Sequence, residues 1–228
     1  MTPRALITAG PTRARLDAVR FVMNTSSGAL GAAIAAEGLA RGWLVDLVSG
    51  AGSVRPPAHA GLTIHPVSWL SDLEPMLQRL SETGAFSAVF HAMAVMDFAP
   101  SEARPEKRAS GAPWTIELHP TPKMIDRFGV WFPNACLVGF KLESGITEAE
   151  LVSRAARLAR RCGADIVVAN LLEWVETGYR CLVVDRDGIV RAEVAGREAT
   201  AAWLWRHVEV HRPVPVPATG SHDMIGGN

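Results

Sequence analysis

The chain has 228 residues, 48% of them hydrophobic, and its 23 basic side chains are balanced by 23 acidic ones. This length allows a full α/β core, and the balanced charge argues against a general nucleic-acid surface or a polybasic membrane patch. No apolar run reaches the roughly 18 residues of a membrane span, and the N-terminus lacks a signal-peptide pattern. The three cysteines, an odd number without metal or redox spacing, fit a reducing compartment. We therefore expect a soluble, cytoplasmic protein that does not bind nucleic acid or membranes.

Apolar runs typical of strands alternate with helical periods along the first 170 residues. This pattern predicts an α/β fold of the Rossmann-like, doubly wound kind, with helices on both faces of a mainly parallel sheet. The predicted strands cover residues 5–8, 44–48, 62–67, 88–92, 136–140 and 165–169. The predicted helices cover residues 29–41, 71–81, 122–131 and 148–162; Ser71 with Glu74, and Thr147 with Glu150, have the spacing of capping boxes.

The pattern changes after Asn170. Residues 181–185 and 189–194, joined by Asp187-Gly188, predict an antiparallel hairpin, and residues 198–208 predict a last helix. A hairpin appended to a sheet exposes an edge that a symmetry mate often covers, so we expect a homodimer. The alternating prolines after residue 211 predict a disordered tail over residues 212–228. The preceding residues, 1–211, are predicted to form a single domain.

The first strand leads into a polar loop and then an Ala-rich helix, which together are typical of an anion site. Free backbone N–H groups and hydroxyls at a helix N-terminus bind phosphate oxygens. The spacing is not that of a dinucleotide fingerprint, because Gly10-Pro-Thr12 and Ser27-Gly-Ala-Leu-Gly31 lie far apart and no tight GxGxxG occurs. A Gly-rich turn alone is a weak signal, since any α/β protein needs small residues here.

Ligands of open parallel sheets bind beyond the carboxyl ends of the strands. The residues that follow the predicted strands form a coherent polar set: Gly10 and Thr12, the segment from His91 to Asp97, Lys141 and Glu143, and Asn170. Two further segments lie between the fourth and fifth predicted strands. One is a basic segment around Lys107, and the other runs from Thr121 to Met124, with Pro122 expected in the first turn of a helix.

The order of these motifs resembles the phosphopantothenate–cysteine ligase family, also called phosphopantothenoylcysteine synthetase. The resemblance covers about residues 6–208 and rests on the combination of Val19-Arg-Phe-Val-Met-Asn-Thr-Ser-Ser-Gly28, Ala94-Val-Met-Asp-Phe98, Thr121-Pro-Lys-Met124 and Val138-Gly-Phe-Lys-Leu-Glu143. The chain is similar to the free-standing form of the family, so we expect it to lack the flavin-dependent decarboxylase domain that many bacterial members carry in front.

The resemblance implies a ligation of 4′-phosphopantothenate with cysteine in coenzyme A biosynthesis, through an acyl-nucleotide intermediate. CTP or ATP would be the cosubstrate and Mg²⁺ would accompany its phosphates, with no metal site built from protein ligands. Asn24 and Lys107 would be the catalytic residues, and Asn24, Arg20 and Asn170 would contact substrate. The implied nucleotide-binding residues are Gly10, Thr12, Ser26, Ser27, Gly28, His91, Ala92, Met93, Asp97, Thr121, Pro122, Lys123, Met124 and Phe140.

Structural alternatives exist for these residues: Asn24 could close a turn, Asp97 could cap local backbone, Phe140 could belong to the core, and Lys107 could be only solvated. Pro11 removes an amide donor, and Arg13 reverses the charge found in the family. A helix lysine pair of many bacterial members is also missing. These departures favour, as an alternative, a catalytically altered nucleotide-binding homologue. A nicotinamide-dependent reductase is disfavoured, because the only tyrosine, Tyr179, lacks a lysine four residues later.

Overall fold

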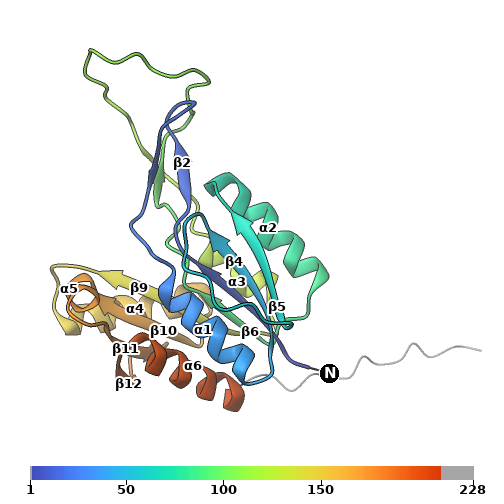
Figure 1. Ribbon diagram of the computed structural model, residues 1–228. Helices are drawn as coiled ribbons and strands as arrows, with labels where there is room; N and C mark the ends of the chain where they lie inside the picture. The colour runs from blue at the N-terminus through green and yellow to red at the C-terminus, as the bar shows by residue number, and fades with distance from the viewer. Residues whose placement is uncertain (1, 212–228) are drawn as a thin grey trace, which may run out of the picture.

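A mainly parallel sheet forms the centre of the computed structural model, which describes residues 2–211 (Figure 1). Its strands are β1 Arg4–Ala9, β4 Leu44–Gly50, β5 Leu62–Val67, β6 Ala88–His91, β9 Cys136–Glu143, β10 Ile166–Leu171, β11 Arg180–Asp185 and β12 Val190–Ala195. They lie in the order β12-β11-β10-β9-β6-β1-β4-β5, and only β11 and β12 run antiparallel to their neighbours. This arrangement confirms the predicted Rossmann-like fold with an appended hairpin.

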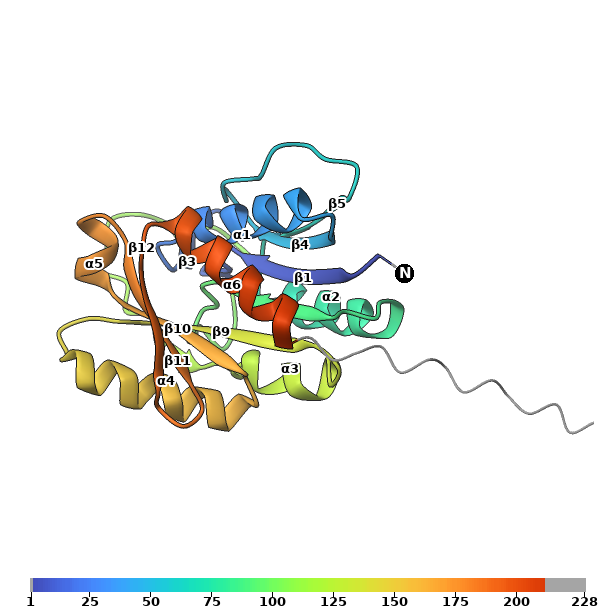
Figure 2. The ribbon, with the colours of Figure 1, turned by 90° about the horizontal axis from the view of Figure 1, so that it is seen from below.

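Helices cover both faces of the sheet because the central strands are apolar on both sides (Figure 2). On one face, α2 Leu70–Thr83, α3 Ile125–Trp131 and α4 Glu148–Cys162 contribute to one core cluster, and on the other α1 Ala29–Ala40 and α6 Arg197–His211 contribute to a second. Trp205 anchors α6 on α1, because its indole N–H donates to the Ile34 carbonyl at 2.7 Å and its side chain is fully buried. A short helix, α5 Leu172–Glu176, follows β10.

The strand order reverses between β1 and β6. The chain passes from β1 outward to β4 and β5, and then returns to β6 on the other side of β1. At such a switch point the connecting segments leave in opposite directions and open a crevice beyond the carboxyl ends of the two strands. The fold therefore places residues 10–28 and 92–97 at the same crevice; we call residues 92–97 the switch-point segment.

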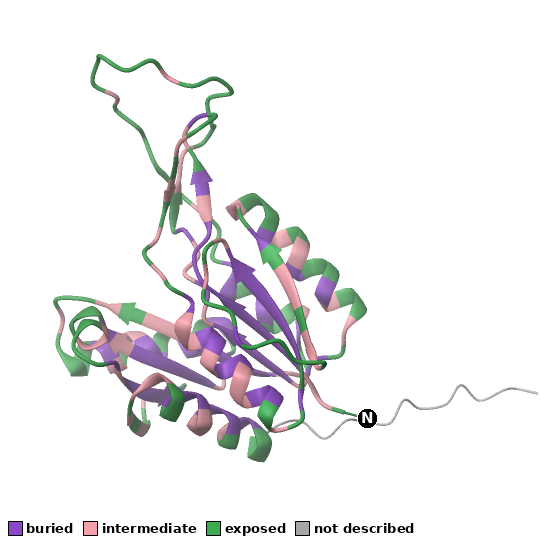
Figure 3. Ribbon diagram, in the orientation of Figure 1, coloured by how far each residue is buried: buried purple, intermediate pink, exposed green. Residues whose placement is uncertain are grey.

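Two thin arms project from this end of the sheet and are largely exposed (Figures 1 and 3). One is the hairpin of β2 Arg13–Arg15 and β3 Phe21–Met23, and the other begins with the ribbon of β7 Phe98–Ala99 and β8 His119–Pro120. Residues 100–118 connect β7 to β8 as an irregular loop, which we call the flap. The sequence pattern did not predict the arms, because strands of two or three residues have no measurable periodicity.

Most predicted elements have their expected type, with two local corrections. The Thr147 capping box is present, since the Thr147 hydroxyl accepts from the Glu150 amide and the Glu150 carboxylate accepts from the Thr147 amide. The Ser71 capping box was wrong: α2 begins at Leu70, and Asp72 accepts from the Trp69 amide. The helix expected from residue 122 begins at Ile125, so Pro122 lies in the irregular segment before it.

The expected tail at residues 212–228 lies outside the described residues. Within residues 2–211, every helix is too short or too polar to cross a membrane.

Candidate functional site

Three glycines allow the polypeptide to cross itself closely at the switch point. Gly10 and Gly28 have positive φ angles of 80° and 71°. A Cβ on Gly10 would lie 1.6 Å from Ser53 Oγ, and a Cβ on Gly28 would lie 3.2 Å from the Gly10 amide nitrogen. A Cβ on Gly50 would lie 2.2 Å from the Pro11 carbonyl oxygen. The loops after β1, before α1 and after β4 are therefore packed so closely that these positions require glycine.

The N-terminus of α1 opens toward this crossing. Gly28 is its N-cap residue and makes no side-chain cap, and no acidic side chain occupies the first turn. The Ser27 hydroxyl accepts from the Ala29 amide at 3.3 Å, and Ser26 is half-buried beside it in the chain. Because the first N–H groups of a helix have no partners within the helix and carry partial positive charge, this end is suited to bind an anion.

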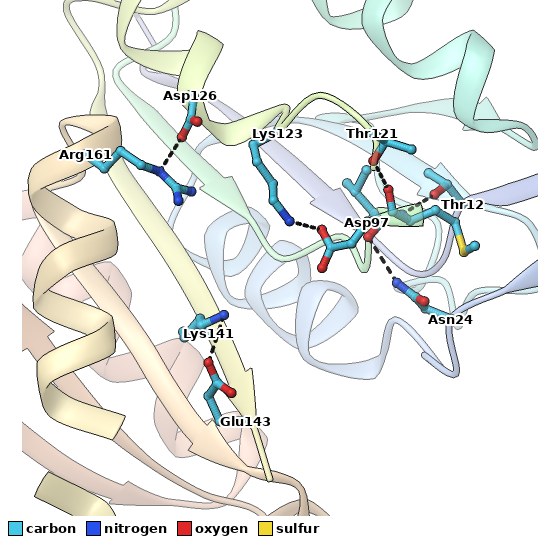
Figure 4. Close-up of polar contacts among 11 residues, drawn as sticks. Thr12, Asn24, Asp97, Thr121, Lys123, Asp126, Lys141, Glu143 and Arg161 are labelled. Carbon is cyan, nitrogen blue, oxygen red and sulfur yellow. Dashed lines mark hydrogen bonds and ion pairs between the residues drawn. The ribbon is translucent and has the colours of Figure 1, made fainter. Parts of the chain in front are cut away.

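Three side chains from different parts of the chain hold the switch-point segment in place (Figure 4). Thr12 Oγ1 accepts from the Met96 amide at 3.0 Å, Asn24 Nδ2 donates to the Val95 carbonyl at 3.0 Å, and Thr121 Oγ1 donates to the Met96 carbonyl at 2.5 Å. Thr12 is fully buried. Its hydroxyl thus orients the loop, and it offers no surface to a ligand.

An exposed ion pair marks the end of this segment. Lys123 Nζ lies 2.5 Å from Asp97 Oδ1, and the Thr121 amide donates to the Asp97 carbonyl at 2.9 Å. The side chains of Asp97 and Lys123 are 60% and 46% exposed, so solvent screens the pair and it can open at little cost. Together they present one acceptor and one donor to the crevice, a combination that can recognise the edge of a nucleobase.

His91 lies at the end of β6 with its imidazole buried. Its Nδ1 is 2.8 Å from Thr8 Oγ1, and the Met93 amide donates to the same hydroxyl at 3.4 Å. The Phe128 ring packs against the imidazole, with 4.4 Å between the two ring centres. Burial lowers the His91 pKa to about 4, so the ring is neutral at physiological pH. Met93 and Met124 are buried as well. These side chains shape the crevice from within the core, whereas Ala92 and Pro122 retain exposed surface.

The carboxyl ends of β9 and β10 form the far wall of the crevice. Phe140 and Asn170 are half-buried there. Beyond Phe140, Glu143 binds Lys141 at 3.0 Å and Arg154 at 2.9 Å, and these two cations lower the Glu143 pKa although burial raises it. In Figure 4 the Lys141–Glu143 pair lies apart from the contacts around Asp97.

Arg20 and Lys107 do not lie with the other candidate residues on the sheet. Arg20 belongs to the turn between β2 and β3, and Lys107 is exposed on the flap, which projects beyond β2 (Figure 1). The two arms nevertheless meet, because Arg20 Nη1 donates to the Arg108 carbonyl at 3.2 Å. The positive charge expected to bind phosphate is thus carried by the arms.

Sequence reasoning missed three residues that shape the site. Thr8 orients His91, Ser53 fills the space beside Gly10 and Gly28, and Asp17 bonds the turn between β2 and β3. Only Asp17 carried a signal, since it stands three residues before Arg20 in an otherwise apolar and basic stretch. The other two are small polar residues whose roles depend on contacts distant in sequence.

The sequence departures noted above have structural roles. Pro11 pairs with Ala94 in an isolated parallel bridge, in which the Gly10 carbonyl accepts from the Ala94 amide and the Thr12 amide donates to the Ala94 carbonyl, so the missing proline N–H is not needed. The Arg13 guanidinium lies 4.5 Å from the Phe21 ring centre, within the hairpin. Leu158 and Cys162, which occupy the positions of the missing lysine pair, lie on the buried face of α4 and belong to the core.

Comparison with known proteins relates this geometry to one family. Residues 2–209 match the DNA/pantothenate metabolism flavoprotein C-terminal domain. The coenzyme A biosynthesis bifunctional protein CoaBC of Thermococcus kodakarensis is 36% identical over 210 residues, which are 90% of this chain and 51% of that protein. A cysteine/cysteine sulfinic acid decarboxylase from an unknown prokaryotic organism is 31% identical over 214 residues, 90% of this chain and 57% of that protein. The chain thus spans about half the length of the curated relatives it matches.

Solved structures share the same architecture. The DNA/pantothenate metabolism flavoprotein from Streptococcus pneumoniae has a TM-score of 0.84 at 25% identity, and the match covers 92% of this chain and 100% of that chain. The C-terminal domain of a coenzyme A biosynthesis bifunctional protein CoaBC has a TM-score of 0.72 at 27% identity, covering 91% and 94% of the two chains.

Proposed function

Because the chain belongs to the DNA/pantothenate metabolism flavoprotein C-terminal domain family, we propose that it ligates 4′-phosphopantothenate with cysteine in coenzyme A biosynthesis. The observation that supports this most directly is the crevice itself. A helix N-terminus without acidic residues, two positive-φ glycines and an exposed Asp97–Lys123 pair lie around one switch point. A phosphate site beside a base-reading edge is what a nucleotide requires.

The reaction proposed has two steps. A carboxylate oxygen of 4′-phosphopantothenate attacks the α-phosphorus of CTP or ATP; the bond from this phosphorus to the bridging oxygen breaks, and pyrophosphate leaves. The cysteine amine then attacks the acyl carbon, the bond to the nucleotide oxygen breaks, and the nucleoside monophosphate leaves while the amine proton passes to solvent. Activation is needed because a free carboxylate is a poor acyl donor.

The protein contributes positioning and charge stabilisation. In this proposal Ser26, Ser27, Gly28 and the α1 N-terminus bind phosphate, and Gly10 lets the backbone approach it. Asp97, Lys123 and Phe140 contact the base. The remaining assigned residues follow the same division: His91, Ala92, Met93, Thr121, Pro122 and Met124 shape the base site, Thr12 orients the switch-point segment, and Arg20 and Asn170 contact substrate.

Asn24 holds the Val95 carbonyl with its amide nitrogen, which leaves its amide oxygen to accept from the acyl-nucleotide or its water shell. Lys107 supplies a mobile positive charge when the flap closes over the phosphates. Mg²⁺ would bind through triphosphate oxygens and water.

We also propose that the active form is a homodimer. The two arms expose apolar side chains that a second copy could cover: Val19, Phe21, Met23, Phe98, Ile116 and Leu118. The hairpin edge at β12, the surface expected from the sequence, exposes fewer, namely Ile189 and Val190.

A pyrophosphate-release assay tests the function. The chain is incubated with 4′-phosphopantothenate, cysteine, Mg²⁺ and either CTP or ATP, and the acyl-cysteine product is confirmed by mass spectrometry. We expect release that depends on both organic substrates. Nucleotide binding without release would support the catalytically altered homologue, and CO₂ release from cysteine without nucleotide would support a decarboxylase.

A further inference from the structure

The Asp17 carboxylate is buried in the turn between β2 and β3, where the hairpin arm meets the flap. The residue is 1% exposed although its neighbours Ala18 and Val19 are exposed. Its Oδ1 accepts from the Val19 amide at 2.9 Å and the Arg20 amide at 2.8 Å, and its Oδ2 accepts from Arg20 Nη1 at 2.5 Å. Burial raises the Asp17 pKa, but the hydrogen bonds outweigh it and lower the pKa to about 2, so the group is charged at neutral pH.

The same carboxylate also reaches the flap. Asp17 Oδ2 accepts from the Arg108 amide at 3.1 Å, and Arg20 Nη1 donates to the Arg108 carbonyl at 3.2 Å. A third bond runs from the Arg104 amide to the Leu16 carbonyl at 3.1 Å. These bonds bracket Lys107, which immediately precedes Arg108.

Trp114, on the returning half of the flap, packs at the same place. The guanidinium carbons of Arg108, Arg20 and Arg104 lie 5.4, 5.8 and 6.0 Å from its ring centre. Arg108 Nη2 also donates to the Pro113 carbonyl at 2.8 Å. Both halves of the flap are therefore fastened to the hairpin turn, and the charged Asp17 carboxylate accepts hydrogen bonds from both arms.

We propose that Asp17 is the positioning residue that fixes Lys107 relative to Arg20, so that flap and hairpin act as one unit in the ligation. This inference rests on the proposed function. A flap of 19 residues without regular structure would otherwise sample many positions, and Lys107 would reach the phosphates only rarely. Holding the backbone on the C-terminal side of Lys107 removes much of that freedom before the substrates bind.

The Asp17→Asn variant tests the proposal, with Glu102→Gln as the matched control. Glu102 lies on the same flap and is exposed. In Asp17→Asn one amide group replaces an acceptor oxygen, so an N–H faces the donors. We expect kcat to fall at least tenfold with the nucleotide KM within twofold, and we expect faster amide hydrogen exchange across residues 104–109. Glu102→Gln should match the wild type in all three. Unchanged exchange and kcat in Asp17→Asn would overturn the proposal.

A double-mutant cycle separates positioning of Lys107 from general damage to the fold. If Asp17 acts through Lys107, then Asp17→Asn should lower kcat less than twofold further in a Lys107→Ala background. Independent, multiplying losses would refute the role.

A second pair of variants serves if Asp17→Asn does not fold. Arg108→Pro removes the amide that donates to Asp17, whereas Arg108→Ala keeps it. We therefore expect kcat to fall further in Arg108→Pro than in Arg108→Ala; equal effects would refute the role. Absence of product from the wild type would instead reject the proposed ligation, and the exchange measurement would still report whether Asp17 fastens the flap.

Discussion

Replacing Gly31 with alanine should weaken nucleotide binding, because it displaces the N-terminus of α1 from β1. A Cβ at position 31 would lie 2.3 Å from the Ala9 Cβ and 3.4 Å from the Ala9 Cα. Carbon atoms in good contact are about 3.5–4.0 Å apart, so the helix must move by roughly 1 Å or more. The amides proposed to bind phosphate belong to this turn of the helix and would move with it.

The magnitude follows from opposing effects. Overpacking a close contact costs about 1–3 kcal/mol, while alanine in place of glycine in a helix stabilises by up to about 1 kcal/mol. The free energy of unfolding should therefore fall by about 0–3 kcal/mol. Losing the alignment of one or two phosphate hydrogen bonds, at about 1 kcal/mol each, should raise the Kd for CTP or ATP by roughly tenfold.

Gly38→Ala is the matched control on the same helix. Its Cβ would lie 2.2 Å from the buried Trp205 ring, so the steric clash is similar to that at position 31. The clash occurs, however, at the end of α1 distant from the crevice. Chemical denaturation should show comparable losses of stability, and isothermal titration calorimetry should show weaker nucleotide binding only for Gly31→Ala. Equal nucleotide affinity in the two variants would refute a phosphate site at the N-terminus of α1.

Three further outcomes are expected. Asn24→Asp should abolish product formation and lower stability by about 1 kcal/mol, because it also removes the donor that holds the switch-point segment; wild-type turnover would argue against the catalytic assignment. Asp46→Asn should cost about 3 kcal/mol at pH 7, since Asp46 is buried against Arg4 and His65. Burial raises the pKa of Asp46 but its partners lower it more, so this stabilisation is present above its ordinary pKa of 3.8 and is lost as the pH falls further; denaturation curves of both proteins should converge at acid pH. Phe21→Glu should give a monomer by light scattering, whereas Val190→Glu should not; the reverse result would place the dimer interface at the hairpin edge.

The sequence predicted the sheet well because each central strand is a short apolar run between turn residues, and α2 and α4 alternate apolar and polar residues with a clear helical period. The predicted helix from residue 122 shows where such patterns fail. Thr121 bonds back to both Met96 and Asp97 through its hydroxyl and amide, and the helix begins only at Ile125. A contact between residues 25 positions apart overrode a local helix signal, and no local pattern contains that information.

The sequence predicted which candidate residues lie close together, but not which of them are exposed to the crevice. The rule that ligands bind beyond the carboxyl ends of strands located Gly10, Thr12 and Asp97 at one crevice. It could not distinguish a side chain that faces the crevice from one that supports it. Thr12 is fully buried while Asp97 is exposed, and this difference depends on which way each loop turns after its strand.

The distribution of charge gives a reason for carrying Lys107 on an arm. On the sheet, the cations nearest the crevice are already paired: Lys123 with Asp97, and Lys141 with Glu143. In the proposed reaction a triphosphate must bind and pyrophosphate must then leave. A lysine fixed in the crevice would attract both anions equally, whereas a lysine on a flap withdraws its charge when the flap opens. Because Asp17 fastens the flap to the hairpin, the two arms would move together as Lys107 approaches and leaves the phosphates.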